Sequence, residues 1–138
     1  MITATTSRAP QEQATVTIAA DRGWQSTGLL LEADRQYKIS ATGRYELARD
    51  ADGVWWCEPG GVTIEYHAGR PLGMLLGAID SSPAQFAHPV AIGLGTIITP
   101  EQAGTLYLRV NDSPGALADN RGDLVVSLVS RVESPEPD

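Results

Sequence analysis

The sequence has a single cysteine, Cys57, so no disulfide can form within the chain. It has no apolar run that approaches the ~20 residues needed to span a membrane. Residues 1–10 also lack the apolar segment of a secretory signal peptide. With 138 residues, the chain is long enough to bury a hydrophobic core as one domain without disulfides or structural zinc. We therefore expect a single domain with no membrane insertion.

Basic residues are few. The chain has 10 Lys and Arg against 17 Asp and Glu, which gives a formal charge of −7. Such a chain repels phosphate backbones, so we do not expect nucleic acid as a partner. No basic amphipathic stretch is present to bind an anionic membrane surface. The acidity suits a cation as ligand, although most surface carboxylates simply keep a protein in solution.

Long helical patterns are absent, whereas turn-forming residues are plentiful, with 14 Gly and 9 Pro. This balance favours many short strands joined by turns. We expect about eight strands, over 15–18, 27–32, 37–42, 62–67, 74–79, 90–98, 105–110 and 124–132. Residues 48–61 and 81–89 lose the alternation and are predicted to be loops. The prediction is an all-β fold, a β-sandwich or jelly roll.

The domain is expected to cover residues 14–132, between a disordered lead at 1–13 and a disordered tail at 133–138. Its clearest strand is 105–110. There, alternation should turn Leu106, Leu108 and Val110 toward the core and Tyr107 and Arg109 outward.

Oxygen-bearing side chains gather in residues 111–123, between two predicted strands. Asp112 follows a rigid strand, and Asp119 and Asn120 lie on the return. Calcium takes 6–8 oxygen ligands from carboxylates, amides and carbonyls, so this loop is a candidate calcium site. The alternative is an ordinary turn, because Asn, Asp, Gly and Pro are the common turn residues.

The order of residues in this loop resembles the PA-IL-like family of calcium-dependent galactose-binding lectins. The shared pattern is Asn111-Asp112-x-Pro114-Gly115, a short spacer, Asp119-Asn120, one residue and Gly122. The resemblance implies calcium ligands on the side chains of Asp112, Asp119 and Asn120, on the carbonyl of Ala116 and on a carbonyl near Leu47. Asp119 stands where the family has Asn, and Ala116 where it has Thr. The resemblance also implies a galactose-binding-domain-like sandwich, a non-catalytic domain and a homo-oligomer.

The same resemblance implies a galactose-like sugar, bound beside the ion at Asp112, Ser113 and Asp119. The His and Gln that contact the sugar ring in the family have no counterpart in residues 48–61. Trp55 and Trp56 could provide a flat apolar platform for a sugar instead. His67, which lies beyond this segment, is a further candidate for contact with the sugar. The alternative is a structural or protein-interaction β-sandwich that keeps the fold without sugar binding. No nucleophile motif indicates an enzyme.

Overall fold

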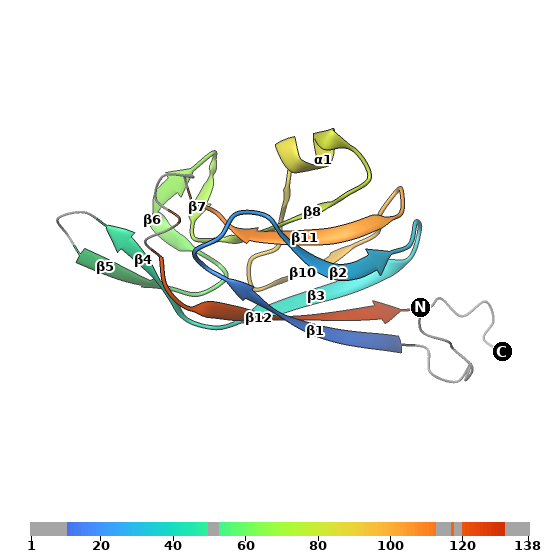
Figure 1. The fold of residues 1–138 in the computed structure, drawn as a ribbon, viewed down its shortest axis with the longest axis horizontal. Coiled ribbons are helices and arrows are strands. Elements are labelled where there is room, and N and C mark those ends of the chain that lie inside the picture. Colours follow the sequence, from blue (N-terminus) through green and yellow to red (C-terminus); the bar gives the residue numbers. More distant parts are fainter. Residues whose placement is uncertain (1–10, 50–52, 113–116, 118–119, 132–138) are drawn as a thin grey trace.

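Two four-stranded antiparallel sheets face each other and enclose the core (Figure 1). The computed structural model describes residues 11–49, 53–112, 117 and 120–131; of residues 11–12, 48–49, 53–55, 63–66 and 131 it describes the main chain alone. The lower sheet in Figure 1 has the order β1 (Gln11–Ala19), β12 (Asp123–Arg131), β3 (Gln36–Thr42), β10 (Gly95–Ile98). The upper sheet has the order β2 (Gln25–Leu31), β11 (Gly104–Val110), β8 (Leu75–Ile79), β9 (Val90–Ala91). The predicted all-β sandwich is thus confirmed.

Two hairpins extend from one end of the sandwich (Figure 1). One pairs β4 (Tyr45–Arg49) with β5 (Gly53–Cys57), and the other pairs β6 (Val62–His67) with β7 (Arg70–Leu72). The prediction of a loop over residues 48–61 was wrong where β5 forms. Four consecutive apolar residues, 54–57, hide the alternation there, although Cys57 is buried and Trp56 is 52% exposed.

The core lies between the two sheets and follows the predicted alternation. On β11, Leu106, Leu108 and Val110 are at most 1% exposed, and on β12 Leu124 and Val126 face them from the lower sheet. Strand β8 is buried at every position, as its continuous apolar sequence predicts for a strand covered on both faces.

One short helix, α1 (Pro83–Ala87), lies in a segment that the sequence predicted to be a loop. A single turn is too short to produce a helical repeat in the sequence. Its Phe86 packs edge-to-face against Trp24 and Tyr107, with ring centroids 5.3 and 5.4 Å apart. Within the described part of the chain, no helix has the length and apolar character required to cross a membrane.

The predicted strand over residues 90–98 is divided between the two sheets. Strand β9 pairs with β8 in the upper sheet, and β10 pairs with β3 in the lower sheet. Gly93, at φ +59°, lies between them, and glycine adopts this left-handed conformation without the strain of a side chain. Strand β1 begins at Gln11, inside the segment expected to be a lead, because its main chain pairs with β12 out to Arg131. Residues 1–10 and 132–138 lie outside the described residues.

Candidate functional site

Asp112 and Asn120 meet at the end of the sandwich, where the candidate loop leaves β11 and returns toward β12. Both side chains are 2% exposed. The Asn120 Nδ2 donates to the Asp112 Oδ2 at 3.1 Å and to the carbonyl of Ala20 at 3.2 Å. Ala20 follows β1 and is itself 0% exposed. The two sides of the loop are therefore joined by a buried carboxylate–amide contact that is anchored to a third segment.

The main chain of β4 runs beside the returning side of the loop. The Glu46 N–H donates to the Arg121 carbonyl at 2.8 Å, and the Arg121 N–H donates to the Glu46 carbonyl at 3.0 Å. Because the two segments are antiparallel and Glu46 lies opposite Arg121, Leu47 lies opposite Asn120. Three of the five residues that the sequence proposed as metal ligands, Leu47, Asp112 and Asn120, are thus brought together from distant parts of the chain.

Hydrogen bonds from the Asn111 side chain connect the β6–β7 hairpin to the start of the loop. Its Nδ2 lies 2.9, 3.1 and 3.0 Å from the carbonyls of His67, Arg70 and Pro71. Its main-chain N–H donates to the Met74 carbonyl at 2.8 Å, and its carbonyl accepts from the N–H of Gly73 at 2.7 Å. The sequence predicted no role for Asn111, although this residue is part of the loop motif.

Arg109, on the outer face of the upper sheet, contacts the main chain at the same end of β11. Its Nη2 donates to the main-chain carbonyl of Asp112 at 2.9 Å, and its guanidinium lies 5.7 Å from the centroid of the Trp24 ring. Burial lowers the pKa of Arg109, and the negative charge of Asp112 opposes that shift. The sequence placed Arg109 outward but gave no signal of this contact.

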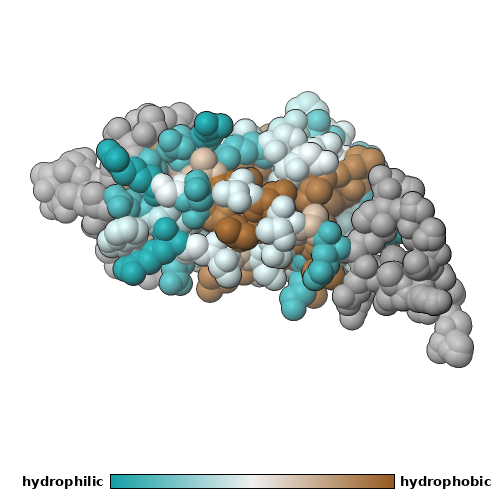
Figure 2. Space-filling model, turned by 60° about the horizontal axis from the view of Figure 1, so that its bottom comes forward, coloured by the Kyte–Doolittle hydropathy of each residue, from teal (hydrophilic) through white to brown (hydrophobic). Residues whose placement is uncertain are grey.

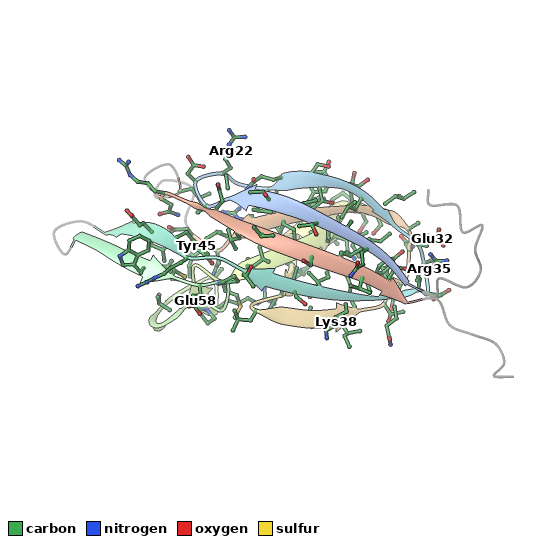
Figure 3. All side chains as sticks on the ribbon, turned by 90° about the horizontal axis from the view of Figure 1, so that it is seen from below. Arg22, Glu32, Arg35, Lys38, Tyr45 and Glu58 are labelled. Atoms are coloured by element: carbon green, nitrogen blue, oxygen red, sulfur yellow. The ribbon has the colours of Figure 1, made fainter. Side chains whose placement is uncertain are left out.

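The β4–β5 hairpin has one face in the core and one in solvent. Tyr45 and Leu47 are 0% exposed, and the Tyr45 hydroxyl donates to the Gly73 carbonyl at 2.6 Å. Tyr45 lies near Glu58 at this end of the molecule (Figure 3). Trp56 pairs with Glu46 on the opposite face, and the guanidinium of Arg44 lies 4.8 Å from its ring centroid.

Several proposed site residues are not placed. Ser113, Ala116 and Asp119 lie outside the described residues, and so does the side chain of Trp55. His67 is half-buried, with its main-chain carbonyl held by Asn111. In the described part of the chain, no three His, Cys, Asp or Glu side chains gather as a metal-binding group. Among the described residues, the candidate ligand set consists instead of one carboxylate, one amide and main-chain carbonyls; Asp119 lies outside them.

Cys57 lies beneath the hairpin with its side chain 4% exposed. Burial raises the pKa of its thiol, and hydrogen bonds from Tyr45 and the Gly61 main chain oppose that shift. A nucleophilic cysteine needs a lowered pKa, so the surroundings of Cys57 favour a packed core thiol.

No protein-family model matches the chain, and no curated protein matches its sequence. Among solved structures, it is similar to one described as "EclA N-terminal domain; PllA-like lectin". The TM-score is 0.63 at 18% sequence identity, and the match covers 85% of this chain and 95% of the other. At this identity the similarity shows that the two chains share their fold, a lectin-like β-sandwich.

Proposed function

We propose that this domain is a non-catalytic carbohydrate-binding domain that holds a calcium ion among Asp112, Asn120 and the main chain of Leu47. The observation that carries the proposal is the buried Asp112–Asn120 pair, at 3.1 Å, beside β4. A carboxylate that is 2% exposed has lost most of its hydration, and a bound cation offsets that cost. Carboxylate, amide and carbonyl oxygens are also the ligands that calcium prefers.

The remaining ligands are proposed from the loop spacing. Asp119 and the carbonyl of Ala116 would complete the set, and two carboxylates would balance the charge of the ion. When bound, calcium would offer open coordination positions to two neighbouring hydroxyls of a sugar. A galactose-like ring is the proposed ligand, with the Asp112 and Asp119 carboxylates accepting from its hydroxyls and Ser113 as a further hydrogen-bonding partner.

The β4–β5 and β6–β7 hairpins are proposed to contact the sugar ring from either side of the loop. Trp56, 52% exposed, offers an aromatic surface to the apolar face of a sugar, and the guanidinium of Arg44 lies 4.8 Å from its ring centroid. Trp55 is a second aromatic candidate. His67 is held close to the loop by Asn111 and is proposed as a hydrogen-bonding partner. A neutral sugar is also compatible with a chain of formal charge −7.

Thermal melts with calcium and with a chelator test the metal claim. Calcium at 100 times its dissociation constant should stabilise the folded state by about 2.7 kcal/mol, which raises the melting temperature by several degrees. Asp112→Asn should abolish this shift. Asp80→Asn is the matched control, because Asp80 is an exposed carboxylate at the end of β8. No shift at millimolar calcium would refute the calcium site.

A glycan array, run with calcium and with chelator, tests the sugar claim. We expect binding to galactose-terminated glycans that chelation removes. A protein that calcium stabilises but that binds no glycan would instead support the alternative, a β-sandwich that recognises another protein.

A further inference from the structure

The turn that joins β1 to β2, residues 20–24, contacts both sides of the candidate loop. On the returning side, the main-chain carbonyl of Ala20 accepts a hydrogen bond from the Asn120 side-chain amide at 3.2 Å. At the start of the loop, the Arg109 guanidinium lies 5.7 Å from the centroid of the Trp24 ring. One short turn therefore connects the two segments that carry the described candidate ligands.

The β1–β2 turn is itself closed by Gln25, the first residue of β2. The Gln25 Oε1 accepts from the Ala19 N–H at 2.9 Å. The Gln25 Nε2 donates to the carbonyls of Ala19 and Gly23 at 2.9 and 3.2 Å. Ala20 and Trp24 both lie in or beside the segment that these three hydrogen bonds close.

Arg109 links this turn to the main chain at the start of the loop. Its Nη2 donates to the Asp112 carbonyl at 2.9 Å, and its Nε donates to the Val110 carbonyl at 3.3 Å. A guanidinium is planar and presents its donors in a fixed fork, so two such bonds define its orientation. These bonds use the main chain of Asp112, whereas its carboxylate accepts from Asn120.

Aromatic rings support Arg109 on the outer face of the upper sheet. Trp24 packs edge-to-face against Phe86 of α1, and Phe86 packs edge-to-face against Tyr107 of β11. All four side chains are half-buried. A cation over an indole ring is attracted by the negative face of the ring. The short helix α1 thus supports, through Phe86, the ring that Arg109 contacts.

The surface at this end of the molecule is mostly hydrophilic. Figure 2 shows hydrophilic residues at the left, where the β4–β5 hairpin lies in Figure 1, and hydrophobic residues toward the middle. In the described part of the loop, Leu117 is the one buried apolar side chain. Hydrogen bonds therefore contribute a large share of what fixes the loop, and those with a charged donor are the stronger ones.

We propose that Arg109 is a positioning residue for the calcium site: supported by the Trp24 ring, it holds the Asp112 main chain so that the carboxylate stays beside Asn120. This rests on the proposed function, but Arg109 is not itself a ligand. Groups that orient metal ligands typically change metal affinity by roughly 10–100-fold. Arg109 is also a cation, so its charge alone disfavours calcium. Its positioning role and its charge therefore act in opposite directions.

Calcium titration by calorimetry separates these two effects. Arg109→Met keeps much of the alkyl stem and loses both the donors and the charge, so calcium should bind at least about tenfold more weakly. Arg22→Met is the matched control. Arg22 is exposed in the β1–β2 turn and points away from the sheets (Figure 3), so its removal should not weaken binding. Equal or tighter binding in Arg109→Met would overturn the proposal.

A conservative variant separates positioning from stability. Arg109→Lys keeps a charged donor beside the Asp112 carbonyl, so it should recover part of the calcium affinity that Arg109→Met loses. Thermal melts in chelator give the stability of each variant without the ion. If Arg109→Met melts earlier in chelator but binds calcium with native affinity while it is folded, Arg109 has only a structural role and the proposal is wrong.

Hydrogen exchange in chelator distinguishes failure of this proposal from failure of the calcium site. If the native protein binds no calcium, the calcium site is refuted, but the positioning of the loop is still measurable. The main-chain amides of Asn120 and Arg121 are hydrogen-bonded on the returning side of the loop. Both should exchange faster in Arg109→Met than in the native protein or in Arg22→Met. In a protein without calcium binding, unchanged exchange at both amides would overturn the proposal.

Discussion

Asn111 and Asp112 are neighbours in the sequence and have separate tasks. The Asn111 amide holds the β6–β7 hairpin through the carbonyls of His67, Arg70 and Pro71. The Asp112 carboxylate accepts a hydrogen bond from the Asn120 amide. One residue therefore positions the hairpin, and the next is the proposed ligand.

Exchanging the Asn111 amide for a carboxylate should loosen the hairpin. In Asn111→Asp, an oxygen would face three carbonyls, so we expect a loss of roughly 2–4 kcal/mol in unfolding free energy. Amide hydrogen exchange in residues 62–72 should accelerate in this variant. Asp112→Asn should leave exchange in the hairpin unchanged. Equal acceleration in both variants would contradict the separation of tasks.

The Cys57 thiol should be unreactive in the folded protein. It is 4% exposed, and burial raises its pKa, so little thiolate forms near neutral pH. A thiol reagent at pH 8 should label Cys57 only after denaturant is added. Rapid labelling of the native protein would show that the β4–β5 hairpin opens readily.

At the scale of the elements, Gly73 marks where the turn after β7 packs beneath the β4–β5 hairpin. Its φ is +85°, and a Cβ added there would lie 2.5 Å from the Cys57 Sγ and 2.9 Å from the Leu47 Cδ1. The Gly73 carbonyl also accepts the hydrogen bond from Tyr45. This glycine lets the turn and the hairpin approach closely, and Leu47 is thereby held beside the loop.

Substituting this glycine should separate the two elements. We expect Gly73→Ala to cost about 3 kcal/mol, from overpacking and the left-handed dihedral together. Gly69→Ala is the control, because Gly69 has a similar φ, +82°, with nothing within 4 Å of an added Cβ. It should cost only about 1 kcal/mol. Urea denaturation measures both; equal losses would show that packing at Gly73 contributes little.

For the whole molecule, two buried groups predict a loss of stability in alkali. Burial raises the pKa of Tyr45 far above its ordinary 10.0 and that of Cys57 above 9.0. Above about pH 9, both groups ionise in the unfolded chain while they stay protonated in the folded one. The contribution of each is complete well below its ordinary pKa, 9.0 for Cys57 and 10.0 for Tyr45, and is lost as the pH rises above that value.

The unfolding free energy should therefore fall above pH 9, by up to about 1.4 kcal/mol per pH unit for each group. Tyr45→Phe should flatten the decline above pH 10, although it also costs about 1 kcal/mol at neutral pH through the lost hydrogen bond to Gly73. Tyr107→Phe, at a half-exposed position, is the control. If the unfolding free energy of Tyr45→Phe falls as steeply above pH 10 as that of the unmodified protein, ionisation of Tyr45 does not cause the decline.

Much of the fold could be predicted from local pattern. Alternation identified β3, β11 and β12 and the inward residues of β11, because side chains on a strand alternate between a buried and an exposed face. A continuous apolar run identified β8. Alternation failed at β5, where apolar residues on both faces hide the period, and at α1, where one turn has no period to detect.

The order of residues alone established the strand pattern, the acidic charge and the run of polar residues from Asn111 to Gly122. The fold was needed to show that Asn120 reaches Asp112 and Ala20, that Leu47 lies opposite Asn120, and that Asn111 holds the β6–β7 hairpin. The fold also shows which strands share each of the two sheets. The reason is physical: a strand's alternation depends on its own residues, whereas its partner depends on which distant segments bury their apolar faces together.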